Sequence, residues 1–104
     1  MKALPPLDPA LHQPARLQIA AVLSNVSNAE FAKLREIAGV SDSVLSKHLS
    51  AMADAGYVTL KKAAMDGRQR TWISFTHKGR KAFKAHMAAL QALVASAEQA
   101  AAAE

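Results

Sequence analysis

Residues 40–58 read VSDSVLSKHLSAMADAGYV and predict a helix with two unlike faces. A rotation of about 100° per residue places apolar side chains on one side and mostly small polar side chains on the other. The first side holds Leu45, His48, Leu49 and Met52, and the second holds Ser43, Ser46, Lys47, Ser50 and Asp54. Ser41 and Asp42 can each cap this helix, because their side-chain oxygens accept hydrogen bonds from the first backbone N–H groups. The polar side is slim enough to approach a nucleic-acid groove closely.

A shorter helix is predicted just before this one. Its apolar residues recur at helical spacing and are Phe31, Leu34, Ile37 and Ala38. Gly39 is the natural C-terminal stop, and only a few residues separate it from the cap of the next helix. Two short helices joined this tightly must cross steeply, so residues 28–56 are predicted to form a helix-turn-helix.

Ahead of the helix-turn-helix, a first helix is predicted over about residues 8–25. Asp8 is its candidate N-cap, and Pro9 occupies the first helical position. Pro14 either restarts or kinks this helix one turn later.

After Gly56 the pattern changes from the period of a helix to that of a strand, which predicts a β-hairpin over residues 57–76. Val58 and Leu60 point to one face in the first arm, and Ile73 and Phe75 form the expected core face of the second. Asp66-Gly67 is a turn pair, and the segment 63–69 that joins the arms leaves the register open.

A last helix is predicted over residues 77–104, with Thr76 as its cap and alanine as its most frequent residue. Its apolar positions fall at alternating spacings of four and three: Phe83, Met87, Leu90, Val94, Ala97 and Ala101. Such a seam is longer than a small core can cover, so we expect a homodimer with Leu17, Phe83, Met87, Leu90 and Val94 in its interface. In the alternative, Leu90 and Leu93 fold back on the first helix and residues 98–104 fray.

The composition limits the possible functions. With 104 residues the chain forms one small domain, and the absence of cysteine excludes disulfides, thiolate metal sites and a cysteine nucleophile. Neither a signal peptide nor a long apolar run is present, so we expect a cytoplasmic protein without membrane contact. No catalytic triad or carboxylate pair can be placed, so we expect neither enzymatic activity nor a cofactor. The net charge of the chain is +5, and the positive charge is concentrated in residues 61–84, which contain eight basic residues and one acidic residue. This pattern is typical of a polyanion binder.

The order of predicted elements is that of a winged helix-turn-helix, a mainly α fold with a small β-hairpin (α+β) and a long C-terminal dimerisation helix. Residues 40–58 resemble the recognition-helix block of the MarR and ArsR groups of bacterial transcriptional regulators. Residues 66–80, DGRQRTWISFTHKGR, resemble the wing of these proteins and the start of their last helix. His12-Gln13-Pro14-Ala15-Arg16-Leu17 is similar to the start of the first helix in ArsR-like members. The nearest likeness is to short MarR-related regulators.

This resemblance implies a homodimer that binds a pseudo-palindromic operator in double-stranded DNA and usually represses nearby genes. The third helix would lie in the major groove and the wing would approach the minor groove or its phosphates. The implied DNA-binding residues are Ser43, Ser46, Lys47, Ser50, Arg68, Gln69 and Arg70. Serine and lysine suit phosphates and single acceptors better than bidentate base reading, so we expect modest sequence discrimination. No effector can be deduced.

The sequence leaves several alternatives open. A winged helix can also dock on a protein or on structured RNA, and the fold alone does not decide between these partners. His12, His77 and His86 raise the possibility of a metal site, although His86 has only apolar neighbours at helical spacing. Trp72 either stacks on a base or partner, or covers an edge of the core or the last helix.

Overall fold

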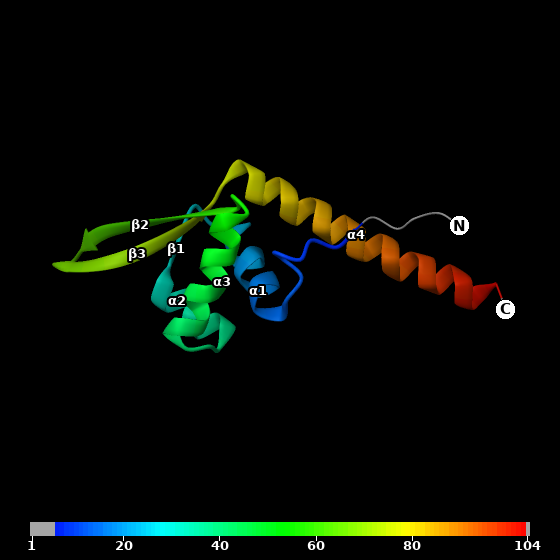
Figure 1. The fold of residues 1–104 in the computed structure, drawn as a ribbon, viewed down its shortest axis with the longest axis horizontal. Helices are drawn as coiled ribbons and strands as arrows, with labels where there is room; N and C mark the ends of the chain where they lie inside the picture. The colour runs from blue at the N-terminus through cyan, green and yellow to red at the C-terminus, as the bar shows by residue number, and fades with distance from the viewer. Residues whose placement is uncertain (1–5, 104) are drawn as a thin grey trace.

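The computed structural model describes residues 6–103 and confirms a mainly helical winged helix fold with a small antiparallel sheet (Figure 1). The elements are α1 (Pro14–Leu23), β1 (Ala29–Glu30), α2 (Phe31–Ala38), α3 (Asp42–Asp54), β2 (Val58–Met65), β3 (Arg68–Phe75) and α4 (His77–Ala102). The strand order is β1-β3-β2. The hairpin of β2 and β3, hereafter the wing, projects from one end of the molecule and α4 from the other. No helix within residues 6–103 is long and apolar enough to cross a membrane.

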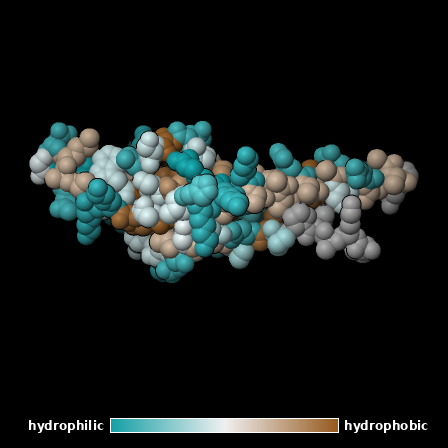
Figure 2. All heavy atoms as spheres, turned by 90° about the horizontal axis from the view of Figure 1, so that it is seen from above, coloured by the Kyte–Doolittle hydropathy of each residue, from teal (hydrophilic) through white to brown (hydrophobic). Residues whose placement is uncertain are grey.

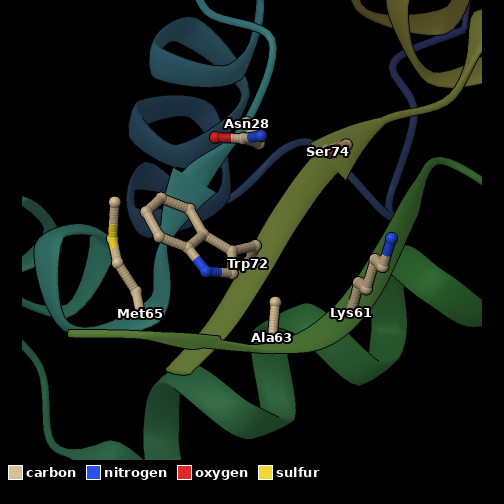
Figure 3. Close-up of a pocket in the computed structure, with 6 residues that line it drawn as sticks. All are labelled: Asn28, Lys61, Ala63, Met65, Trp72 and Ser74. Carbon is tan, nitrogen blue, oxygen red and sulfur yellow. The ribbon is translucent and has the colours of Figure 1, made fainter. Parts of the chain in front are cut away.

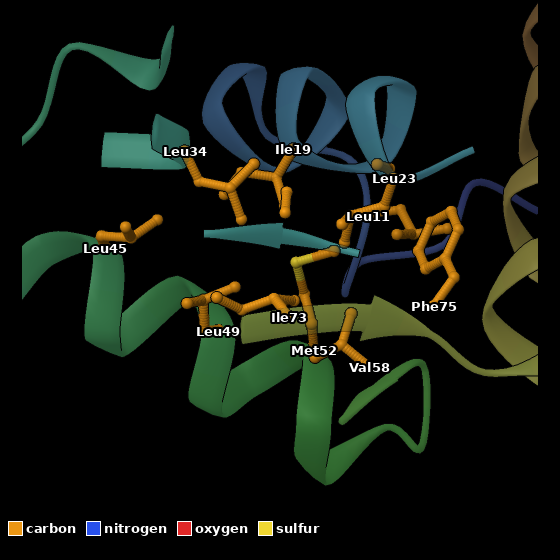
Figure 4. Close-up of a cluster of buried hydrophobic side chains, with 12 residues drawn as sticks. Leu11, Ile19, Leu23, Leu34, Leu45, Leu49, Met52, Val58, Ile73 and Phe75 are labelled. Carbon is orange, nitrogen blue, oxygen red and sulfur yellow. The ribbon is translucent and has the colours of Figure 1, made fainter. Parts of the chain in front are cut away.

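One hydrophobic core joins the first three helices to the sheet (Figure 4). Its fully buried side chains include Leu11 before α1, Ile19 and Leu23 of α1, Leu34 of α2, Leu45, Leu49 and Met52 of α3, and Ile73 of β3. Burial of a leucine-sized side chain stabilises the fold by about 2 kcal/mol, so this cluster fixes the orientation of α3. The apolar side predicted for α3 is therefore its core side.

The first helix starts later than the sequence predicts. Asp8 caps a single turn, because its Oδ1 accepts a hydrogen bond from the Ala10 N–H at 2.9 Å and its carbonyl accepts from Leu11 and His12 at 3.0 and 2.8 Å. Gln13 is then extended, with φ −139° and ψ 143°, which is the conformation favoured before a proline. Of the two expected effects of Pro14, the restart is the one observed.

The wing lies within the predicted range, but its turn is shorter and its strands are longer than predicted. Asp66 and Gly67 both have positive φ, 53° and 76°, as a two-residue hairpin turn of the mirror-image type requires. The register runs from Met65 opposite Arg68 to Val58 opposite Phe75, so the residues expected to form a long connection belong to the strands. β1 adds a third strand that the sequence did not predict, because two residues are too few to show a period.

Hydrogen bonds and close packing hold the start of α4 against the base of the wing. The Thr76 hydroxyl accepts a hydrogen bond from the Gly79 N–H at 2.9 Å, which confirms the predicted cap, and donates to the Gly56 carbonyl at 2.7 Å. A Cβ on Gly79 would lie 2.1 Å from the Tyr57 carbonyl oxygen. Only glycine allows α4 to pass the wing at this distance.

Candidate nucleic-acid interface

The helix-turn-helix presents the polar side of α3 to solvent. The turn is set by Gly39, which ends α2 with φ +66°, and by Ser41, whose Oγ accepts a hydrogen bond from the Val44 N–H at 3.3 Å. An ion pair of 2.6 Å between Arg35 Nη1 and Asp42 Oδ1 bridges the two helices. The residues predicted to face DNA on α3 are all exposed, and they are Ser43, Ser46, Lys47 and Ser50. This side is therefore free to contact a ligand.

A polar contact from α1 supports the opposite side of α3. The Nε–H of Arg16 donates to Nδ1 of His48 at 3.1 Å. Burial, followed by the charge of Arg16, lowers the pKa of His48 below its usual 6.5. His48 is thus a neutral acceptor that ties α3 to α1, in agreement with the packed role indicated by its place on the apolar side.

The two arginines of the wing, Arg68 and Arg70, lie in different environments. Arg68 and Gln69 are exposed at the tip, whereas Arg70 lies further from the tip and is half-buried. Nη1 of Arg70 lies 3.0 Å from Oε2 of Glu30, at the start of α2. Of the two arginines expected to reach a groove, Arg70 is therefore engaged in a contact within the chain.

Two further basic residues of the cationic segment contact the chain itself. Arg80 donates to the carbonyls of Ser24 and Val26 at 3.2 and 3.1 Å and so satisfies acceptors just beyond the end of α1. The Nζ of Lys78 lies 5.8 Å from the centroid of the Tyr57 ring, within the range of a cation–π contact. The exposed positive charge of the wing rests mainly on Lys61, Lys62 and Arg68.

Trp72 lies on the face of the sheet opposite the core. It lines a shallow groove of about 370 Å³ together with Asn28, Lys61, Ala63, Met65 and Ser74 (Figure 3). Lys61 is its cross-strand partner, while the next residue, Ile73, is fully buried on the other face. The indole is half-buried in this groove and covers the outer face of the sheet.

A polar cluster joins the segment before α1 to α4. The Asp8 N–H donates to Nδ1 of His86 at 3.0 Å, and Nε2 of His86 lies 3.2 Å from Nδ1 of His12. The Tyr57 hydroxyl donates to Oδ2 of Asp8. Because Nδ1 of His86 accepts, its Nε2 carries the proton and donates to His12. Sequence reasoning missed this cluster, since its members come from three segments and share no spacing. Within residues 6–103, no group of three or more His, Asp or Glu side chains has an arrangement that could hold a metal ion.

The predicted dimer residues differ in exposure. Phe83 packs against Phe75 with ring centroids 6.3 Å apart, and Leu17, Met87 and Leu90 are partly buried. Val94 is 55% exposed. The C-terminal half of α4 projects beyond the core and is exposed at most positions. Figure 2 shows this projecting half as mostly apolar, with scattered polar side chains.

A family model, a related sequence and several solved structures are similar to this chain. A family model described as a winged helix DNA-binding domain matches residues 15–94. The uncharacterized protein MJ0432 of Methanocaldococcus jannaschii is 39% identical over 69 residues, which cover 66% of this chain and 75% of that protein. A transcriptional regulator homologue from Pyrococcus horikoshii OT3 has a TM-score of 0.77 at 25% identity, over 84% of this chain and 86% of that chain. A MarR family regulator from Silicibacter pomeroyi DSS has a TM-score of 0.65 at 22% identity, over 83% of this chain and 56% of that chain.

Proposed function

The chain belongs to the winged helix DNA-binding domain family, and on this premise we propose that it is a transcriptional regulator that recognises a specific sequence in double-stranded DNA. The observation that carries the proposal is the polarity of α3. Its core side is fully buried at Leu45, Leu49 and Met52, while its other side presents three serines and a lysine. A helix of this shape fits the major groove, where base edges are accessible to short side chains.

In the proposed complex, α3 and the wing have different tasks. Ser43, Ser46 and Ser50 make single hydrogen bonds to bases or phosphates, and Lys47 contacts phosphate. Arg68 and Gln69 at the wing tip approach the minor groove or its phosphates. Arg70 joins this contact only if its ion pair with Glu30 opens, so we place it second to Arg68 in importance.

We further propose that two chains form a homodimer through α4. The half of α4 beyond Leu90 has little cover from the rest of residues 6–103, and Leu93 and Val94 are 40% and 55% exposed there. A two-fold dimer repeats the α3 surface and therefore matches a pseudo-palindromic operator, with half-sites about 34 Å apart. A dimer seated on such a site next to a promoter blocks transcription by occupancy, so repression is the proposed mode of action.

The experiment that tests this function is a selection of binding sequences from random duplex DNA with the full chain. We expect enrichment of an inverted repeat, and we expect Lys47→Glu to abolish binding to it without unfolding the protein. Lys33→Glu on the exposed surface of α2 makes the same change in charge and serves as the control. Failure to enrich any sequence, together with weak and salt-insensitive binding to genomic duplex, would favour a protein or structured RNA as the partner instead.

A further inference from the structure

Val44 is the exposed aliphatic residue of α3. It lies in the first turn of the helix and is 39% exposed, whereas its neighbour Leu45 is fully buried. Val44 belongs neither to the buried core nor to the partly buried residues packed against it, which include Val40 on the other side of the turn. The valine side chain therefore contributes little to the packing that holds α3 in place.

Helix formation does not explain a valine at this position either. A β-branched residue loses side-chain freedom in a helix, and alanine would be more favourable by up to about 0.7 kcal/mol. Helical spacing puts Val44 on the same flank of the exposed side as Lys47 and Ala51, three and seven residues further on. Val44 is thus an apolar group at the edge of the polar surface that we assign to DNA.

The major groove offers one apolar group that matches such a side chain, the C5-methyl of thymine. The neighbouring Ser43 and Lys47 can bond acceptors and phosphates, but neither recognises a methyl group. We propose that Val44 contacts a thymine methyl in the operator and is a specificity-determining residue. This inference rests on the proposed function, because it requires α3 to lie in the major groove.

Replacement of thymine by uracil removes only this methyl group, so it provides a direct test. The probe is the tightest duplex recovered by selection from random DNA, with uracil placed at each thymine position in turn. For the wild-type chain we expect about a fourfold loss of affinity at one position in each half-site, the effect of about 0.8 kcal/mol for one buried carbon group. Replacing both symmetric thymines should cost about sixteenfold. Val44→Ala should bind both duplexes equally well.

Two controls identify the side chain responsible. Ile37→Ala removes an equally exposed aliphatic residue from α2 and should retain the uracil effect. The unfolding free energy of Val44→Ala should stay within about 0.5 kcal/mol of the wild type or rise, as expected for an exposed helical position. Val44→Thr, which keeps one methyl group at almost the same volume, should keep part of the uracil effect.

Several results would overturn the inference while leaving the proposed function intact. In one, the wild type binds the selected duplex but is indifferent to uracil at every position. In another, Val44→Ala shows the same uracil effect as the wild type, so that a different side chain reads the methyl group. A loss of more than about 1 kcal/mol of stability in Val44→Ala would assign Val44 to the fold instead. If no duplex is selected at all, the proposed function itself fails.

Discussion

The guanidinium of Arg70 and the carboxylate of Glu30 form an ion pair that joins the wing to the start of α2. Nη1 of Arg70 lies 3.1 and 3.0 Å from the two carboxylate oxygens, and the two side chains are 30% and 25% exposed. Glu30 is the N-cap residue of α2, yet its side chain makes no capping hydrogen bond. Its carboxylate is directed to Arg70 instead. This contact couples the orientation of the wing to the helix-turn-helix.

The two wing arginines should therefore respond differently to alanine. We expect Arg70→Ala to lower the free energy of unfolding by about 1 kcal/mol, because it leaves a half-buried carboxylate unpaired. Arg68→Ala should leave stability within about 0.5 kcal/mol but reduce the slope of log K against log salt by about 1 for each phosphate that the side chain neutralises. Urea unfolding and salt-dependent DNA titration measure the two effects. An unchanged salt slope in Arg68→Ala would contradict DNA contact by the wing tip.

The close passage of α4 over the wing makes Gly79 sensitive to the smallest substitution. A Cβ at this position would lie 2.1 Å from the Tyr57 carbonyl oxygen and 2.9 Å from Phe75 Cδ1. We expect Gly79→Ala to destabilise the fold by about 3 kcal/mol or more, although alanine normally favours a helix by about 1 kcal/mol. Thermal unfolding measures the loss, with the exposed Lys81→Ala as a control in the same turn. A stabilised Gly79→Ala variant would show that α4 does not pack this closely.

Tyr57 is the only tyrosine, so its ionisation can be followed without interference. Its hydrogen bond to Asp8, and then burial, raise the pKa of Tyr57 from 10.0 to about 12. The stability that this contact provides is complete below pH 10 and is lost as the pH rises toward 12. Ultraviolet absorbance should therefore show phenolate only near pH 12 in the folded chain, and closer to pH 10 in Asp8→Asn. Identical midpoints in the two proteins would exclude the contact.

His86 should make the fold sensitive to mild acid. Burial, and next the neighbouring His12, lower the pKa of His86 below 6.5. The unfolded chain then binds a proton at higher pH than the folded chain, so stability is complete above about pH 6.5 and falls as the pH decreases. The loss for one such group cannot exceed about 1.4 kcal/mol per pH unit. His48, whose pKa is also lowered, contributes in the same direction.

The contribution of His86 can be isolated with His86→Gln, whose amide oxygen can still accept from the Asp8 N–H. We expect its unfolding free energy to decline less than that of the wild type between about pH 7 and pH 5, with the remaining decline due to His48. Urea unfolding at a series of pH values provides the curves. A wild-type curve that is flat over this range would contradict the neutral state of both histidines.

The features that the sequence predicts are local, and those that it misses are distant. Ser41, Thr76 and Gly39 act within a few residues of themselves, and the alternation in β3 follows from its own residues, so spacing was sufficient to predict them. Contacts of Asp8 with His86 and of Arg70 with Glu30 span 78 and 40 residues. Such pairs depend on how whole elements pack, and an arginine at a wing looks the same in sequence whether or not it is paired.

For α4 too, local spacing predicts the apolar seam, but the partner of this seam depends on how whole elements pack. Its heptad spacing predicted an apolar seam, and the part beyond Leu90 has little cover from the rest of the described chain. Leu90 and Val94 also line a shallow depression of about 300 Å³ with Gln91, Ala95 and Glu98. Apolar surface of this kind is stabilised when a second helix removes it from water. The homodimer stays a prediction that the mass in solution can test.

Sedimentation equilibrium of the wild-type chain at micromolar concentration should give about twice the 11.0 kDa of one chain. Val94→Glu places a charge in the seam and should shift the mass to that of a monomer, because an unpaired carboxylate resists transfer from water. Ser96→Glu adds the same charge about 200° around the helix, on the other side, and should remain dimeric. The monomeric variant should also bind a full operator more weakly than the wild type, since it must engage each half-site independently. A wild-type chain that sediments as a monomer would rule out the α4 interface.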